Sequence, residues 1–418
     1  MREVALKAAK QPGIDRRWVV EQIAGWQKAR TKLPSWAAVE GIIYPPQLAM
    51  EQCSSEQTAR YKAELARRWM AHPGVADGEA AQEAEKILID LTGGFGIDHA
   101  TLATHFSRTF YIERQSELCD IARHNFDLLR LRQIEVLCGD SAELLPTLPQ
   151  ASLIYADPAR RDEHGQRTYA IADCTPDVCR LMPLLLQRAA CVMLKLSPML
   201  DWHQVVAELN HAAGADVVHE VHIVATGNEC KELLVIVSPL PPTNEEDSHE
   251  GQPHGQCSHL KIDCVNDEQV FTYCPDQGQG IAVPIVEGGE RLDGRWLCEP
   301  NAALMKAGCF GEVCRRYGLR AIAANSHLLV SDAPVADFPG RQFRIDREST
   351  LNKRDLRDAL CGIDRANITV RNFPLSVADL RRRLRLADGG SHYLFATTRA
   401  DGSRVLLVCA GRSVTNNR

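Results

Sequence analysis

The 418-residue sequence lacks the features of a membrane protein or a disulfide-stabilised secreted protein. No apolar run approaches the roughly 18 residues that a membrane-spanning helix needs, which excludes a chain that crosses a bilayer. The first twenty residues carry mixed charges and no long apolar stretch, so we expect no secretory signal peptide. The 15 cysteines are odd in number and scattered, and they include no CxxC pair. Reduced thiols and a cytoplasmic location fit this usage better than a disulfide framework.

Aromatic residues are also few, at 6%, but the hydrophobic and charged fractions of 45% and 24% are those of a globular protein. The net charge of −6 is unevenly distributed. Residues 341–418 hold 16 Lys and Arg against 8 Asp and Glu, a net of +8, which leaves −14 for residues 1–340. A basic end on an acidic body indicates contact with a polyanion, nucleic acid first of all. A solvated arginine-rich helix face is the alternative.

The hydrophobic pattern divides the chain into segments of different character. Helical patterning dominates the start, short apolar runs alternate with helices in the middle, and a segment rich in Pro, Gly, Glu and His interrupts the chain before two smaller α+β units. We therefore predict an N-terminal helical region at 1–85, a main domain at 86–240, a linker at 241–259, and α+β domains at 260–340 and 341–418.

The main domain alternates predicted strands with helices. Strands too apolar to face water, separated by helices, predict a parallel sheet that is covered on both faces. The last two strands are joined by a short connection, so they form a hairpin and give the sheet an antiparallel edge. The predicted strands are Ile87–Leu91, Thr109–Glu113, Ile134–Cys138, Ser152–Ala156, Cys191–Leu196, Asp216–Ala225 and Glu232–Ser238.

The first strand leads into the glycine-rich turn Asp90-Leu-Thr-Gly-Gly-Phe-Gly-Ile-Asp98, and a helix follows. Such a turn lets a ligand approach the backbone closely, with negative groups facing the helix N-terminus. The glycine spacing is not that of the dinucleotide motif GxGxxG, and the turn lacks the Gly-Lys-Ser/Thr of a phosphate-binding P-loop.

Acidic residues stand at or next to the ends of the first four strands. Glu113 ends the second strand and could accept hydrogen bonds from both hydroxyls of a ribose. Asp140 follows the third strand, where an adenine amino group could donate to it, and Asp157 follows the fourth. Each residue taken singly is more often a turn-forming residue than a ligand. Four in succession predict one crevice at the carboxyl edge of the sheet.

This constellation resembles class I S-adenosylmethionine-dependent methyltransferases, whose sheet also ends in a hairpin. The resemblance implies a seven-stranded Rossmann-like sheet with S-adenosyl-L-methionine as cofactor and no metal. It implies that Asp157 and Pro158 lie beside the transferred methyl group. The implied cofactor-binding residues are Asp90, Thr92, Gly93, Gly94, Gly96, Glu113, Asp140 and Ser141.

The turn and the motif Tyr155-Ala-Asp-Pro-Ala-Arg160 also resemble stretches of RNA guanine-N2 methyltransferases. In amino-methylating relatives a second proline and an aromatic residue usually follow Asn/Asp-Pro. Here Ala159 and Arg160 stand in their place, so the motif lacks a stacking surface for a base and the acceptor atom stays open. Lys195 could contact substrate or pair with a carboxylate.

Several neighbouring residues allow two interpretations each. Arg160 and Arg161 could contact RNA or lie on the surface. The segment around Asp173 and Cys174 could cover the site, and Asp177 could instead start the next helix. The His and Cys residues between His249 and His259 lack the paired spacing of a zinc finger, so we do not expect a metal site there.

A wider resemblance covers nearly the whole chain. Segments such as QIAGWQKARTKLPSW (22–36), EQCSSEQTARYKAEL (51–65), LKLSP (194–198), NECKELL (228–234) and RNFPLSVADLRRRL (371–384) are similar to a family of largely uncharacterised bacterial methyltransferases. In that family a ferredoxin-like unit precedes a C-terminal THUMP-like domain. THUMP-type domains of tRNA-modifying enzymes bind RNA, so the resemblance implies tRNA or rRNA as partner, with no obligate protein partner evident.

The predicted helix Ser376–Leu386 supports this partner independently. Four arginines within five positions cannot all face a core, so they form a positive ridge that would bind phosphate without reading base sequence. The predicted RNA-binding residues are Arg371, Arg381, Arg382, Arg383 and Arg385. We expect a cytoplasmic enzyme that methylates a base in RNA, with an exocyclic amine as one acceptor. The alternatives are methylation of a protein or small molecule, and an RNA-binding protein that no longer catalyses.

Overall fold

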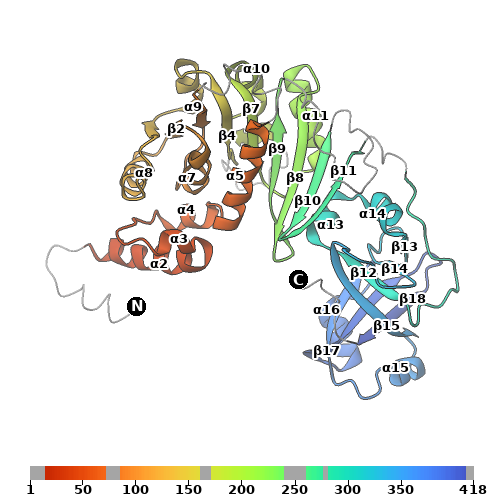
Figure 1. Ribbon diagram of the computed structural model, residues 1–418. Coiled ribbons are helices and arrows are strands. Elements are labelled where there is room, and N and C mark those ends of the chain that lie inside the picture. The colour runs from red at the N-terminus through yellow and green to blue at the C-terminus, as the bar shows by residue number, and fades with distance from the viewer. Residues whose placement is uncertain (1–14, 72–84, 161–170, 240–259, 276–280, 411–418) are drawn as a thin grey trace. The chain divides into compact units, whose positions relative to one another are not determined.

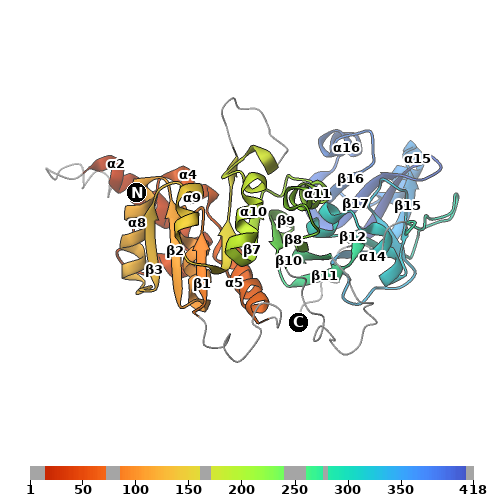
Figure 2. The same cartoon turned by 90° about the horizontal axis from the view of Figure 1, so that it is seen from above.

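The computed structural model describes residues 15–71, 85–160, 171–239, 260–275 and 281–410 (Figures 1 and 2). The chain forms two compact units. The first contains Met1–Val221 and Glu232–Leu260, and the second contains His222–Lys231 and Lys261–Arg418. The boundary between them runs through a β-hairpin of the chain.

The first unit is built on a mainly parallel sheet. Within it the strands run in the order β8-β9-β7-β4-β1-β2-β3. The neighbouring strands from β3 to β7 pair in parallel, and β9 is antiparallel to β7. This confirms the predicted Rossmann-like arrangement of seven strands with an antiparallel edge, and two further strands, β10 (Lys261–Asn266) and β11 (Gln269–Tyr273), follow β8 in the same sheet. The strands are β1 (Ile87–Asp90), β2 (Arg108–Glu113), β3 (Ile134–Cys138), β4 (Ala151–Ala156), β7 (Ala189–Leu196), β8 (Val218–Thr226) and β9 (Glu229–Val237).

Helices connect these strands where the sequence predicts them, and side chains at their N-termini fix where several begin. The Asp177 carboxylate accepts a hydrogen bond from the Arg180 amide, so this residue starts a helix. The Asp201 carboxylate does the same for the His203 amide. The sequence pattern predicts a helix over Gly96–Phe106, but the observed α-helix ends at Leu102, because its last part tightens into a 3₁₀ turn. The helices are α7 (Ile97–Leu102), α8 (Ser116–Leu128), α9 (Ser141–Leu144), α10 (Val178–Arg188) and α11 (Trp202–Ala213).

Within residues 15–71, four helices precede the sheet, drawn in red in Figure 1: α2 (Arg16–Lys32), α3 (Pro34–Ala37), α4 (Gln47–Gln52) and α5 (Glu56–Met70). The segment around α3 and α4 packs its apolar side chains on the glycine-rich turn, and the rings of Trp36 and Tyr44 lie 5.2 and 6.3 Å from that of Phe95. Helix α5 packs against α7. The N-terminal helices therefore support the turn that follows β1.

The second unit contains a β-hairpin and a larger, separate sheet. Strands β10 (Lys261–Asn266) and β11 (Gln269–Tyr273) form an antiparallel hairpin that our sequence analysis did not single out. A separate seven-stranded sheet has the order β13-β14-β12-β15-β18-β17-β16. Its first part consists of β12 (Trp296–Pro300), α13 (Ala302–Ala307), α14 (Phe310–Tyr317), β13 (Arg320–Ala321) and β14 (Leu329–Ser331). The sequence pattern predicts one continuous helix over Asn301–Tyr317, but Gly308 adopts a left-handed conformation and ends α13.

The pattern of apolar residues over 341–418 predicts the order β, α, β, α, β, β, and the C-terminal part of the structure has this order. Its elements are β15 (Gly340–Thr350), α15 (Lys353–Ala359), β16 (Arg365–Arg371), α16 (Val377–Leu384), β17 (Ala387–Thr398) and β18 (Arg404–Ala410). Strand β15 pairs with β18 on one side and with β12 on the other, from Trp296 opposite Arg344 to Pro300 opposite Gly340. The two predicted α+β segments thus share one sheet.

None of the described helices combines the length and apolar character needed to cross a membrane. Of the cysteines in the described residues, thirteen are free thiols, in agreement with the expected reduced state, whereas Cys274 is disulfide-bonded. The expectation of reduced thiols throughout was therefore wrong at Cys274.

Candidate functional site

The carboxyl ends of β1, β2 and β4 are bound to one another by short hydrogen bonds. The Gly94 amide donates to Glu113 Oε2 at 2.9 Å, and the Tyr111 hydroxyl donates to the Gly94 carbonyl at 2.5 Å. On the other side, the Asp157 amide donates to Thr92 Oγ1 at 2.6 Å. The turn after β1 is therefore fixed between the tips of its two neighbouring strands, as expected for parallel strands that end at one edge.

The described side chains do not fill the space beside the Gly94 backbone in this turn. Its φ of +57° is a left-handed conformation, and a Cβ built there would meet only the Thr92 carbonyl oxygen, at 3.8 Å. The space beside its backbone is thus clear of side chains among the described residues. Gly93 and Gly96 complete the turn. A cofactor could therefore approach the main chain here, as the resemblance implies.

Glu113 retains the capacity to hold a ribose. Its two carboxylate oxygens accept hydrogen bonds from the Gly94 and Gln115 amides, each at 2.9 Å. A carboxylate has about four lone-pair positions, so about two remain for the hydroxyls of a ribose. The open space at Gly94 and the unused acceptor positions of Glu113 together fit S-adenosylmethionine.

Asp90 and Thr92 lie under the turn. Asp90 is only 1% exposed, and its carboxylate accepts a hydrogen bond from the Thr92 amide at 2.9 Å and lies 3.3 Å from His99 Nδ1. Burial raises the pKa of Asp90, while His99 and the Thr92 amide oppose this. Both residues were predicted to bind the cofactor; their contacts here hold the shape of the turn.

Asp140 begins α9, where its carboxylate accepts a hydrogen bond from the Ala142 amide at 2.8 Å. The Gly139 amide donates to the Glu113 carbonyl at 2.9 Å, which ties the end of β3 to that of β2. The Asp140 side chain is 40% exposed and its Oδ2 lies 3.7 Å from Arg114 Nε, so the carboxylate is partly accessible to a ligand. Ser141 is 4% exposed.

Asp157 is the partly exposed carboxylate at the end of β4, and Pro158 behind it is buried. Lys195 Nζ donates to Asp157 Oδ2 at 2.5 Å, with the lysine side chain 12% exposed. Burial alone would lower the pKa of Lys195, but the carboxylates of Asp157, Asp98 and Glu232 outweigh it and raise the pKa. Of the two roles considered for Lys195, the structure shows the ion pair.

A second lysine lies fully buried behind this site, and our sequence analysis did not identify it. Lys62 of α5 is 0% exposed, and its Nζ lies 2.8 Å from Glu232 Oε2 of β9, 3.1 Å from Asp98 Oδ1 and 3.0 Å from Ser54 Oγ. The Tyr155 hydroxyl donates to Asp98 Oδ2 at 2.7 Å. We call Lys62, Asp98 and Glu232 the buried ion cluster.

The buried ion cluster joins segments that are distant in sequence. Burial alone would raise the pKa of Asp98, but the cations of Lys62 and Lys195 outweigh it and lower the pKa. Lys62 falls among alanines and Leu65 on the buried face of α5, and Glu232 precedes the apolar end of β9. A single charge on an otherwise apolar face is the signal that could have revealed both, because such a charge needs a partner.

Of the other residues predicted near the site, the structure describes some and not others. Arg160 lies in the short strand β5 (Ala159–Arg160), which pairs antiparallel with β6 (Cys174–Thr175). Thus the segment around Cys174 pairs with the end of the Asp157 motif. Arg161 and the His and Cys residues of the linker lie outside the described residues.

The predicted arginine ridge divides into two sets. Arg381 is 21% exposed and donates to the Ala366 and Ala387 carbonyls and to Asp388, while Arg371 pairs with the buried Glu299. The exposed set is Arg382, which pairs with Asp379, Arg383, which donates to the Leu351 carbonyl, and Arg385 at the end of α16.

Comparison with known proteins agrees with this architecture. Residues 296–339 match the family model of a ferredoxin-like domain, and residues 340–410 match that of a THUMP domain-like module. A crystal structure from Porphyromonas gingivalis W83, described as a candidate methyltransferase, is 34% identical, covers 98% of this chain and 96% of its own, and superposes with a TM-score of 0.79. This chain belongs to the same family of bacterial class I methyltransferases with a THUMP-like C-terminal domain.

Curated relatives of this THUMP-like methyltransferase family carry the activity in their names. Two proteins from strains of Mycobacterium tuberculosis, named uncharacterised S-adenosylmethionine-dependent methyltransferases, are each 25% identical over 316 residues. The match covers 75% of this chain and 77% of each relative. The chain is an S-adenosylmethionine-dependent methyltransferase.

Proposed function

We propose that this methyltransferase transfers a methyl group to a base in RNA and that an exocyclic amine is the acceptor. We call the carboxyl ends of β1, β2, β3 and β4, with the glycine-rich turn, the methyl-transfer edge. The observation that carries the proposal is that the same chain contains this edge and a THUMP-like module whose helix α16 exposes Arg382, Arg383 and Arg385. A surface of this charge suits a phosphate backbone. An RNA substrate would place the enzyme in the cytoplasm.

We assign the cofactor to the edge formed by the turn and the tips of β2 and β3. Gly94 would offer its open backbone to the methionine part, Glu113 would accept from the ribose hydroxyls, and Asp140 would accept from the adenine amine. Bound there, S-adenosylmethionine supplies an activated sulfonium methyl group. Little further activation of the methyl donor is then required of the protein.

Asp157 is the residue we assign to the acceptor. Its carboxylate is partly exposed and held by Lys195, so it could accept a hydrogen of the amine and direct the nitrogen lone pair toward the methyl group. Lys195 stays protonated because its pKa is raised, so it positions Asp157 and does not remove the proton. The proton that the amine loses after transfer would leave through Asp157 or water.

Tritium transfer tests the substrate class. Full-length protein is incubated with S-adenosylmethionine labelled in the methyl group and with total RNA and total protein from cells that lack the gene. We expect label in RNA, and none with Asp157→Asn, which keeps the size of the side chain but not its charge. Label found only in protein would refute RNA as the substrate. Calorimetry with S-adenosylmethionine shows that the variant still binds cofactor.

A second experiment tests the role of α16. Replacing Arg382, Arg383 and Arg385 by Gln should weaken RNA binding and reduce its dependence on salt. If all three contact phosphates, the slope of log affinity against log salt should fall by about 2. A matched control is the replacement of Arg60, Arg67 and Arg123, three exposed arginines of the first unit. Equal slopes in both triple variants would show that α16 has no special role.

A further inference from the structure

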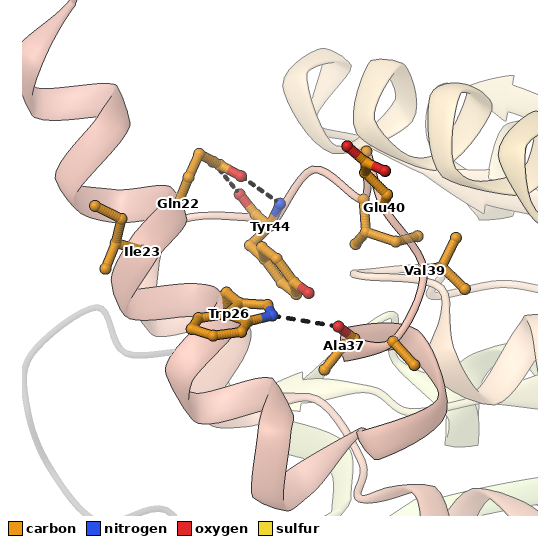
Figure 3. A pocket seen from close by; sticks show the side chains of 10 residues that line it. Gln22, Ile23, Trp26, Ala37, Val39, Glu40 and Tyr44 are labelled. Atoms are coloured by element: carbon orange, nitrogen blue, oxygen red, sulfur yellow. Dashed lines mark hydrogen bonds between the residues drawn. The ribbon is translucent and has the colours of Figure 1, made fainter. Parts of the chain in front are cut away.

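A pocket of about 440 Å³ lies between α2 and the segment that follows α3 (Figure 3). This volume is within the range of sites for small organic ligands. The methyl-transfer edge does not account for it, because every lining residue belongs to the N-terminal helical segment. The lining residues are Gln22, Ile23, Trp26, Ala37, Ala38, Val39, Glu40, Gly41, Ile42 and Tyr44.

The walls of the pocket are held in place by specific contacts. The Gln22 side-chain amide donates to the Tyr44 carbonyl and accepts from the Tyr44 amide, both at 2.8 Å. Gly25 faces Tyr44 so closely that an added Cβ would lie 2.4 Å from the Tyr44 Cβ. The indole Nε1 of Trp26 donates to the Ala37 carbonyl at 3.2 Å, which fixes the plane of the ring. The pocket is therefore preorganised.

Two polar groups of the pocket are available to a ligand. Tyr44 is 5% exposed, and among the described residues its hydroxyl has no hydrogen-bond partner; Figure 3 shows the ring inside the pocket, between Trp26 and Glu40. The hydroxyl lines the pocket without a hydrogen-bond partner from the described residues, so a ligand atom could bond to it. Burial also raises the pKa of Tyr44, so the hydroxyl keeps its proton and can donate. The exposed Glu40 carboxylate can only accept.

The aromatic wall is accessible as well. Trp26 is 43% exposed although it is a large apolar side chain, and the Arg30 guanidinium lies over one face of its ring, 5.2 Å from the ring centre. A base that stacks on this ring would therefore use the other face or displace the guanidinium. A flat exposed ring, a hydroxyl donor, a carboxylate acceptor and a nearby cation are the groups that recognise a nucleobase with its phosphate. An aliphatic peptide side chain would leave Glu40 and the hydroxyl unused.

We propose that this pocket binds an unpaired base of the nucleic-acid substrate, with the base stacked on Trp26. The proposal extends the proposed function by adding a second contact for RNA. It also fits the position of the pocket, because Tyr44 packs against Phe95 of the glycine-rich turn and the pocket therefore adjoins the methyl-transfer site of the same unit.

The test uses mononucleotides, so that it does not depend on RNA methylation. Full-length protein is first saturated with S-adenosylhomocysteine, which keeps the probes out of the cofactor site. Binding of AMP, GMP, CMP and UMP is then measured by saturation-transfer NMR. We expect at least one to bind, and Trp26→Ala to lower its affinity about 5- to 150-fold, the range for loss of one stacked base. Trp18→Ala is the matched control, since Trp18 lies on the same helix, is 50% exposed and does not line the pocket.

Tyr44→Phe is the second variant. It keeps the ring that packs on Phe95 and removes only the hydroxyl, so it should fold even if Trp26→Ala does not, and it should bind the preferred mononucleotide more weakly. The proposal is overturned if no mononucleotide binds, or if binding is the same in wild type and in both pocket variants. If mononucleotides bind through Trp26 but no RNA is methylated, the pocket stands and the proposed substrate fails. If RNA is methylated but no mononucleotide binds through Trp26, the proposed substrate stands and the proposed base-binding role of the pocket is refuted.

Discussion

Replacing Lys62 by Met should destabilise the first unit strongly. The Lys62 ammonium is completely buried and has a carboxylate on two sides, Glu232 at 2.8 Å and Asp98 at 3.1 Å. Removing one partner of a buried ion pair leaves an unpaired charge and costs about 3–5 kcal/mol. Loss of a cation beside Asp98 and Glu232 also means that both carboxyl groups should take up protons at a higher pH than in the wild type.

The assay is urea unfolding followed by hydrogen exchange of the amides in α5 and in residues 232–237 of β9, all of which belong to the first unit. The matched control is Arg67→Met on the same helix, where Arg67 and Glu64 form an exposed pair. An exposed pair contributes about 0.2–1 kcal/mol, so this variant should be close to wild type. Glu232→Gln added to Lys62→Met should restore part of the loss, because the unpaired carboxylate is gone.

Two results would refute this reasoning. One is a loss of less than about 1 kcal/mol for Lys62→Met, since that is the range of an exposed pair. The other concerns the double variant. If Glu232→Gln lowers the stability of the Lys62→Met variant by as much as it lowers that of the wild type, the two residues act independently and are not an ion pair.

Further predictions concern the methyl-transfer edge. Glu113→Gln should weaken S-adenosylmethionine binding by about tenfold or more, since hydrogen bonds to a charged group contribute about 1.5–3 kcal/mol, and calorimetry measures this. Its melting temperature should stay within a few degrees of wild type; unchanged affinity would remove Glu113 from the site. The raised pKa of Lys195 means that its ion pair is complete below the ordinary lysine pKa of about 10.4 and is lost only as pH rises through the higher folded value. The kcat of the wild type should therefore show no decline due to Lys195 between about pH 7 and 10. A decline in that range that disappears in a Lys195 variant would contradict the assignment. Lys195→Met should lower kcat far more than it changes KM.

The sequence was sufficient to predict where the strands of the first sheet lie along the chain and which of them end in acidic residues, because both depend on local pattern. Apolar runs mark buried strands, and a carboxylate after a run must lie near the end of that strand. The same logic placed Glu113 and Asp157 at one edge, where hydrogen bonds from Gly94 and to Thr92 link their strands. Local pattern alone does not decide whether a carboxylate at a strand tip points outward or lies beneath the turn, as Asp90 does.

Long-range pairing was beyond the sequence analysis for a physical reason. Lys62 and Glu232 are 170 positions apart, and no periodicity relates them. Their proximity depends on α5 packing behind the sheet beside β9, which only the tertiary structure specifies. The arginines of α16 give a similar lesson. The occurrence of four arginines within five positions predicted exposed side chains, and three of the four are exposed. Arg381 is instead held by the Ala366 and Ala387 carbonyls, which come from β16 and β17.

The seven-stranded sheet of the second unit has a consequence for how this family can be dissected. The border between the two matching family models, at residues 339 and 340, falls between β12 and β15, which are hydrogen-bonded neighbours. A protein truncated there would expose the backbone groups of β12 as an open edge, which invites aggregation. Fragments for expression should therefore keep 296–410 intact. The ferredoxin-like and THUMP-like parts match two separate family models, yet their strands form a single hydrogen-bonded sheet.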